Sequence, residues 1–410
     1  MKVLFVTSRY QYGDPARGEA YEHQNFLPAL RRLGHEVQVF DHRLRSQYAD
    51  FIALNRALLE KVEAWRPQAV LFVQGLYEVW SETWEILRSS GIAAAVNWAT
   101  DDSWKYPQAS RFLAPHFDAF VTTAPERASD YARDGYHRVL VSQWAADATR
   151  LQYPLPSMEC QYDVSFIGQR YGRRPGFIRA LERAGIRVEC FGHGWPRGSV
   201  SGESIAPLMR QSRISLNFSG QGYASRFLPQ RRQVKARVFE VPGAGGFLLS
   251  EWAPGIDGYY RLGEEIDVFR TEEELVSKVQ YYLRNPEVRD ACARRASERT
   301  VQEHTYDARM RELLEFTVAQ HAQMPPGTGQ IDWASFGKAA SRHTVSPFLR
   351  FLRASLTGAA RPFAGKKRAP RAARRFLFEL SWRFAGSGTF SASGLPGRLF
   401  YHESNTLLKR

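Results

Sequence analysis

Short apolar runs alternate with longer amphipathic segments through the first 320 residues or so, and this alternation limits the folds open to the chain. In the first half, helical patterns such as 20–33, which ends at Gly34, separate the runs. The runs are VLFVTS, EVQVFD, AVLFVQG, IAAAVNWATDD, DAFVTTA and RVLVSQWA. Continuous apolar strands separated by helices of about 10 to 15 residues are typical of parallel sheets covered on both faces. The sequence therefore predicts a doubly wound α/β domain over residues 1–150.

A second series of the same kind follows and predicts a second α/β domain over residues 162–323. Its expected strands are DVSFIGQ, IRVECFG, ISLNFSG, GFLLSE and DVFR. The segment 151–161 contains two prolines and has no hydrophobic period, so we interpret it as the linker. Two Rossmann-like domains that face a cleft would bind a ligand outside the carboxyl ends of their strands.

The positive charge of the chain is concentrated in its last 80 residues. The net charge is +14, and residues 331–410 alone hold fifteen Lys and Arg against three acids. A Pro/Gly-rich segment, 324–330, precedes this basic tail, and Phe, Leu and Trp are interleaved with its cations. A basic amphipathic tail of this kind favours an anionic membrane surface. The alternatives are a solvated tail packed on the body and, less favoured because no recognition motif accompanies the charge, a nucleic-acid-binding segment.

Other features of the sequence indicate a cytoplasmic protein, peripheral on the inner face of the cell membrane. No apolar window approaches the length of a bilayer span, and the short N-terminal run VLFV suits a buried strand better than a signal peptide. The three cysteines are far apart, which excludes a disulfide framework and a zinc cluster.

The segment 230–251, QRRQVKARVFEVPGAGGFLLSE, has the composition of a site for a nucleoside diphosphate. Lys235 and Arg237 would neutralise phosphates beside helix N-terminal amides, and Glu240 would accept two ribose hydroxyls. Glycines that permit close backbone approach follow at Gly243, Gly245 and Gly246. The alternative is a surface helix with ordinary charges and a glycine turn.

Five segments in this order resemble the glycosyltransferase-like C-terminal domain of the CgeB-like family, within the GT-B superfamily. They are YDVSFIGQR (162–170), ISLNFS (214–219), KARVFEVPGAGGFLLSE (235–251), EEIDVFRTEEELVSKVQYYLRNPEVR (264–289) and EHTYDAR (303–309). The first half is similar to the more variable acceptor-side domain of that family.

The resemblance implies a glycosyltransferase that uses a nucleotide-diphosphate sugar and binds it mainly through the C-terminal domain. It implies that Glu240 holds the donor ribose and that Lys235 and Arg237 lie near the diphosphate. Related retaining enzymes carry a second glutamate seven to eight residues before the ribose glutamate, but RRQVKARVF has no carboxylate. Retaining and inverting chemistry therefore both stay open.

Four further residues are candidates for the transfer step. Arg170, after the strand FIGQ, is placed to reach the phosphates, although it also suits a solvated basic turn. Asp101 and Asp102 follow an apolar strand, and paired carboxylates can raise one pKa into the range of a general base; helix capping is the alternative. His23 is a second base candidate, with a structural role as its alternative. We expect no metal and no cofactor beyond the donor, because cationic side chains and helix dipoles can stabilise the departing diphosphate.

Together these features predict a metal-independent transferase that moves a sugar to a glycan, a lipid-linked saccharide or another cell-envelope acceptor. A non-catalytic saccharide-binding or scaffold protein of an envelope or coat structure is the alternative from another class. An enzyme that alters a sugar nucleotide without any acceptor, such as a 2-epimerase, is the third possibility.

Overall fold

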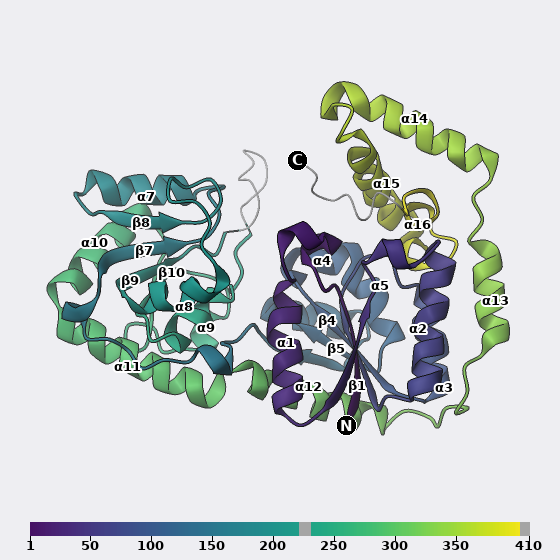
Figure 1. Cartoon of the computed structure of the whole chain (residues 1–410), viewed down its shortest axis with the longest axis horizontal. Helices are drawn as coiled ribbons and strands as arrows, with labels where there is room; N and C mark the ends of the chain where they lie inside the picture. Colours follow the sequence, from purple (N-terminus) through teal and green to yellow (C-terminus); the bar gives the residue numbers. More distant parts are fainter. Residues whose placement is uncertain (221–230, 402–410) are drawn as a thin grey trace. The chain divides into compact units, whose positions relative to one another are not determined.

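The computed structural model describes residues 1–220 and 231–401, and these form two compact units (Figure 1). Unit 1 comprises Met1–Thr122, Arg127–Val141 and the chain from Met310 onward. Unit 2 comprises Thr123–Glu126 and Ser142–Arg309. The second unit therefore ends before residue 323, where the sequence predicted the end of the second domain.

The sheet of unit 1 has six parallel strands within the described residues, in the order β2-β1-β3-β4-β5-β6. The strands are β1 (Lys2–Thr7), β2 (Glu36–Asp41), β3 (Ala69–Val73), β4 (Ala94–Ala99), β5 (Ala119–Thr122) and β6 (Val139–Val141). The central strands are buried along their whole length, which explains why their sequences are apolar at every position rather than at alternate ones.

Helices connect these strands and cover the sheet of unit 1. They are α1 (Tyr21–Arg32), α2 (Phe51–Trp65), α3 (Ser81–Ser90), α4 (Asp102–Lys105), α5 (Arg111–Leu113) and α6 (Ala128–Arg133). As predicted, the chain leaves the first helix through Gly34, whose φ of 78° lies in the left-handed region that favours glycine.

Unit 2 repeats this architecture with a five-stranded parallel sheet among the residues described, in the order β11-β10-β9-β7-β8. Its strands are β7 (Tyr162–Ile167), β8 (Val188–Phe191), β9 (Ser212–Asn217), β10 (Leu248–Glu251) and β11 (Asp267–Phe269). Its helices are α7 (Arg174–Arg183), α8 (Gly202–Arg210), α9 (Arg237–Gly243), α10 (Glu272–Arg284) and α11 (Pro286–Glu303). The next helix, α12 (Tyr306–His321), begins in unit 2 and ends in unit 1. The doubly wound α/β prediction is confirmed for both units.

The basic tail is part of unit 1, which corrects the prediction of a tail separate from the two domains. It forms α13 (Trp333–Arg342), α14 (Pro347–Ala364), α15 (Ala369–Ala385) and α16 (Leu395–Leu399), drawn in yellow-green in Figure 1. Ile331, Phe336, Phe390 and Tyr401 are buried in the core that also contains the strands β1 and β3. Residues 402–410 of the predicted tail lie outside the described residues. None of the described helices combines the length and the apolar character that crossing a bilayer requires.

Candidate functional site

The carboxyl ends of β7, β9 and β10 in unit 2 meet around a buried carboxylate, Glu251. This last residue of β10 is only 2% exposed. One of its oxygens accepts hydrogen bonds from the backbone N–H groups of Ser219 (3.0 Å) and Gly220 (3.1 Å). The other accepts from Arg232 Nε at 3.1 Å. The carboxylate thereby fixes the loop that leaves β9, at the sheet edge where α/β proteins bind ligands.

Two arginines converge beside Glu251 on the space left by Gly168, at the end of β7. A Cβ at Gly168 would lie 3.2 Å from Arg237 Nη2 and 3.4 Å from Arg174 Nη1. The guanidinium of Arg174 stacks on the ring of Tyr171, 3.9 Å from its centroid. Burial, and then the charge of Arg237, lower the pKa of Arg174 to about 10, while Tyr171 and Glu251 act in the opposite direction.

Both arginines keep hydrogen-bonding capacity beyond their protein contacts. Arg174 donates from Nη1 to Gln169 O and from Nη2 to Tyr171 Oη, each at 2.9 Å. The Nε atoms of Arg174 and Arg237 are buried, and neither has a hydrogen-bond partner within residues 1–220 and 231–401. Two adjacent guanidinium groups repel each other unless an anion lies between or beside them. Glu251 supplies one such anion. Guanidinium groups also bind phosphate oxygens in bidentate geometry, so the pair is a candidate site for an anionic ligand.

The other predicted donor residues of the segment 230–251 are close in sequence to this pair. Arg237 is the first residue of α9, and Lys235 O accepts from the N–H of Val238 at 2.9 Å, so Lys235 lies at the start of the helix. Glu240 follows one turn later and is half-buried. The structure thus brings Lys235, Arg237 and Glu240 to the N-terminal half of one short helix, and Arg174 is an additional member of the group.

The three predicted donor-binding glycines lie elsewhere, and here the structure corrects the sequence interpretation. Gly243 ends α9, and a Cβ there would meet Ala146 Cβ at 2.6 Å. Gly245, with a φ of 80°, faces the backbone of 152–154, and a Cβ at Gly246 would lie 2.7 Å from Met209 O. Because these glycines precede β10, they lie at the amino end of the sheet, opposite the arginine pair. Their role is close backbone packing rather than donor binding.

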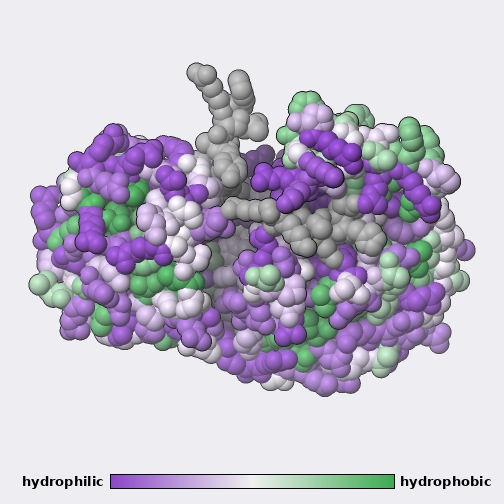
Figure 2. Space-filling view, turned by 45° about the horizontal axis from the view of Figure 1, so that its top comes forward, coloured by the Kyte–Doolittle hydropathy of each residue, from purple (hydrophilic) through white to green (hydrophobic). Residues whose placement is uncertain are grey.

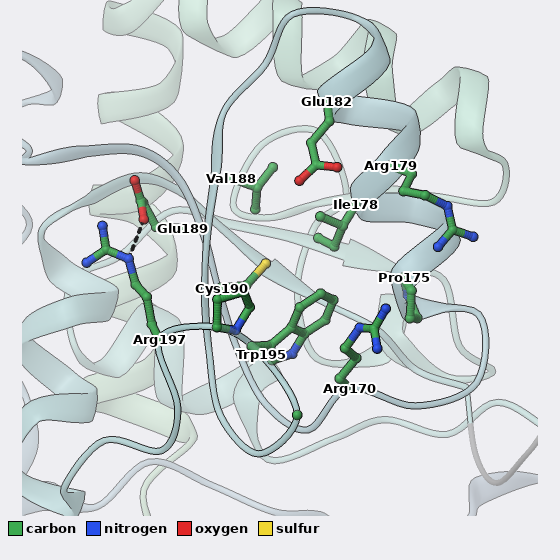
Figure 3. Close-up of a pocket in the computed structure, with 12 residues that line it drawn as sticks. Arg170, Pro175, Ile178, Arg179, Glu182, Val188, Glu189, Cys190, Trp195 and Arg197 are labelled. Carbon is green, nitrogen blue, oxygen red and sulfur yellow. Dashed lines mark ion pairs between the residues drawn. The ribbon is translucent and has the colours of Figure 1, made fainter.

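Arg170 lies in a separate cavity of about 680 Å³ along the edge strand β8 (Figure 3). Its guanidinium stacks over Trp195, 5.6 Å from the ring centroid, and Arg179 and Glu182 of α7 line the same cavity. An ion pair between Glu189 and Arg197, 2.7 Å long, closes one side.

In unit 1 the two predicted catalytic aspartates have different surroundings. Asp102 is fully buried, and its Oδ2 accepts from Thr122 Oγ1 (2.6 Å) and Tyr131 Oη (2.8 Å). Burial raises the pKa of Asp102, and the two hydroxyls offset part of that rise. Asp101 is half-buried at the end of β4 with a φ of 57°, a left-handed conformation that aspartate tolerates. Of the pair, Asp101 is the carboxylate that solvent can reach.

Asp101 belongs to a charged group that also includes Glu22 of α1 and Lys105 of α4. Lys105 Nζ donates to Thr100 Oγ1 at 2.9 Å. Burial raises the pKa of Glu22 and lowers that of Lys105, while the attraction between these opposite charges moderates both shifts. His23, the other predicted base, has its Nδ1 3.6 Å from Glu19 Oε2. A carboxyl group with a raised pKa beside a cation suits proton transfer near neutral pH better than an ordinary surface acid does.

Substitutions should separate the roles of the two aspartates. We expect Asp102→Ala to lower the free energy of unfolding by about 2 to 4 kcal/mol, because it leaves two buried hydroxyls without their acceptor. Asp101→Asn should leave stability unchanged within about 0.5 kcal/mol, since asparagine also tolerates positive φ. Urea denaturation of both variants measures the difference. Equal losses would contradict the assignment of Asp102 as the structural member.

Several residues of these groups gave no distinctive signal in the sequence. Glu251 ends a predicted strand like many surface residues, and its burial depends on a loop more than thirty positions earlier in the chain. Lys105 and Glu22 are more than 80 positions apart. Within the described parts of the chain, no three His, Cys, Asp or Glu side chains are grouped as metal ligands would be.

Comparison with solved structures identifies the fold class. Sucrose-phosphate synthase from Thermosynechococcus elongatus superposes with a TM-score of 0.56 at 12% identity, over 79% of this chain and 100% of that one. A glycosyltransferase from Rickettsia africae ESF-5 gives 0.54 at 11% identity, over 79% and 99%. Anabaena HepE in complex with UDP-glucose gives 0.51 at 12% identity, over 77% and 99%. The chain therefore has the GT-B fold of two Rossmann-like domains, as predicted.

Sequence comparison adds a narrower match, which lies almost entirely in unit 2. Residues 173–315 match the protein-family model described as glycosyl transferase-like. This region includes Arg174, Arg237 and Glu251. A search of curated proteins found no match. The resemblance to the CgeB-like family in particular stays a prediction.

Proposed function

We propose that the protein is a glycosyltransferase that takes its sugar from a nucleotide-diphosphate donor bound to unit 2. The observation that carries the proposal is the pair of arginines that converge on Gly168 at the carboxyl edge of the unit 2 sheet. The glycosyl transferase-like match over 173–315 supports it, and so does the presence of UDP-glucose in the HepE structure.

In this proposal, different side chains around the arginine pair bind different parts of the donor. Arg174 and Arg237, with Lys235, bind the diphosphate, and Glu240 accepts hydrogen bonds from the ribose hydroxyls. In the transfer step, the bond between the anomeric carbon and the diphosphate oxygen breaks as a bond to the acceptor oxygen forms. The guanidinium groups stabilise the negative charge that develops on the leaving diphosphate, and no metal ion is required for this.

We propose that the acceptor side of the reaction belongs to unit 1. There Asp101, with Glu22 and Lys105, is the group best suited to accept the proton of the acceptor hydroxyl; His23 is the second candidate. Asp102 supports this group from the interior of the unit. The acceptor class we propose is a glycan, a lipid-linked saccharide or another cell-envelope acceptor, reached from the cytoplasmic side of the membrane.

A thermal-shift screen against nucleoside diphosphates and their sugars tests the donor assignment. A ligand present at 100 times its dissociation constant should add about 2.7 kcal/mol of stability to the protein. We expect stabilisation by at least one nucleoside diphosphate and by its sugar, and none by the free sugar. Stabilisation by saccharides with no response to any nucleotide would instead favour a non-catalytic saccharide-binding protein. An altered sugar nucleotide formed without acceptor would indicate an epimerase.

A further inference from the structure

Helix α14 of unit 1 carries three phenylalanines that no other part of the described chain covers. Phe348 and Phe351 are each 70% exposed and Phe363 is 93% exposed. At 3.6 residues per turn, the three side chains fall within an arc of about 120° on one side of the helix. An aromatic side chain gains stability when it leaves water, so three on one side of one helix are a surface that requires a partner.

One side of α14 packs against the neighbouring helices of unit 1. Leu349 is buried together with Ala373 and Leu377 of α15 and with Leu399 of α16. Leu352, Leu356 and Ala360 pack against the same cluster. On the same helical wheel these packed residues lie about 40° to 120° from Phe348, so Phe348 and Phe351 project from the side next to them. Phe363, at about 60°, shares their side near the end of the helix and is still 93% exposed.

Exposed cations lie on the opposite side of α14 and in the turn that follows it. Arg350 and Arg361 of α14 are exposed, and so are Lys366, Lys367 and Arg368 in the turn that leads to α15. Across residues 347–385 the sequence has ten Lys and Arg and a single acid, Glu379. Figure 2 shows hydrophobic and hydrophilic residues intermingled at the end of unit 1 formed by these helices. We call the three phenylalanines and the three cations of the turn, Lys366, Lys367 and Arg368, the α14 face.

We propose that the α14 face docks unit 1 on an anionic lipid surface, with the three phenylalanines inserted at the boundary between headgroups and acyl chains. A helix that lies in this boundary combines an apolar side with flanking Lys and Arg, and each cation near an anionic bilayer adds to the attraction. The inference extends the proposed function by giving a membrane partner, and it rests on that function only for the nature of the acceptor.

The composition of the α14 face favours lipid over a protein or a nucleic acid. Its exposed apolar side chains are phenylalanines, and the exposed positions between Phe351 and Phe363 hold mainly small residues. A nucleic acid would be held by the cations alone or by bases stacked on rings, and it would not require the phenylalanines to enter an apolar phase.

Vesicle flotation tests the inference with full-length protein. The vesicles contain phosphatidylcholine alone or phosphatidylcholine with about 30% phosphatidylglycerol, which gives the bilayer a negative surface potential. We expect flotation with the anionic vesicles only. Two triple variants are compared with the wild type: Phe348→Ser/Phe351→Ser/Phe363→Ser and Lys366→Gln/Lys367→Gln/Arg368→Gln. Each should bind the anionic vesicles at least about tenfold more weakly than the wild type does.

The matched control is Met158→Ser, which removes an 82% exposed apolar side chain from unit 2 and should float like the wild type. Thermal unfolding and nucleotide-induced stabilisation are measured for every variant, so that loss of lipid binding is distinguished from misfolding and from failure of the donor site. Equal flotation of the phenylalanine variant and the wild type would overturn the inference. Binding to a soluble polyanion without flotation would overturn it as well, and would assign the cations to a nucleic acid.

Discussion

A chain that stops at Gln330 will not form a stable unit 1, because the segment beyond it completes the core of that unit. Phe336, Phe390 and Tyr401 are buried against residues of β3, α2 and α3. Tyr401 Oη also donates to the carbonyl oxygen of Tyr48 at 2.7 Å. Loss of these three buried aromatic residues, at about 3 to 5 kcal/mol each, costs about 9 to 15 kcal/mol. This is as large as the whole stability of a domain, which is about 5 to 15 kcal/mol.

A single substitution tests the contribution of the segment beyond Gln330 to the core in a protein that still folds. We expect Phe390→Ala, in which a fully buried ring is removed, to lower the free energy of unfolding by about 3 to 5 kcal/mol. Phe363→Ala, on the exposed side of α14, is the control and should change it by less than about 0.5 kcal/mol. Urea denaturation followed by tryptophan fluorescence reports on this unit, since Trp80, Trp84 and Trp98 lie in its core. A truncated chain that unfolds cooperatively at the wild-type urea concentration would contradict the role of the tail.

The tail shows where composition misleads. Its high charge and the Pro/Gly-rich segment 324–330 are the usual marks of a separate tail, and the sequence was interpreted in that way. The buried residues Ile331, Phe336, Phe390 and Tyr401 are single apolar positions in a basic background. No periodic hydrophobic pattern indicates that these residues are buried, because each fills a gap between elements of unit 1 that are distant in sequence. By contrast, the strands of both sheets were predictable, since burial on two faces leaves a continuous apolar run.

The candidate donor site was partly predictable for a related reason. Lys235, Arg237 and Glu240 lie within six residues, so a local pattern could indicate them. Closeness in sequence also suggested Gly243 as a donor-binding residue, but this glycine is six residues after Arg237. A helix rises about 1.5 Å per residue, so this spacing places Gly243 about 9 Å further along the axis, at the other end of the sheet. Arg174 begins α7 and Glu251 ends β10, and only the folded unit brings them to Arg237.

The substitution Arg237→Ala should strongly reduce donor affinity and turnover. It removes one of the two guanidinium groups that we assign to the diphosphate, and loss of one preorganised donor of this kind costs about 10²- to 10³-fold in rate. Glu240→Ala should abolish nucleotide-induced stabilisation without unfolding the protein, because it removes the acceptor for the ribose hydroxyls. Isothermal titration with the nucleotide identified in the thermal-shift screen, and turnover of its sugar, measure the two effects.

Two further variants test whether the losses of affinity and turnover come from lost contacts with the donor. Arg284→Ala removes an exposed arginine from α10 in the same unit and should bind nucleotide like the wild type. Arg237→Lys keeps the positive charge but cannot bind two phosphate oxygens in parallel, so it should recover only part of the affinity. If Arg237→Ala and Glu240→Ala bind the nucleotide as tightly as Arg284→Ala does, the diphosphate does not bind at the arginine pair. If Arg237→Lys binds the nucleotide as tightly as the wild type does, the positive charge alone accounts for the affinity and bidentate binding is refuted. Lysine keeps the charge of arginine but does not impose the planar geometry of a guanidinium group on the phosphate.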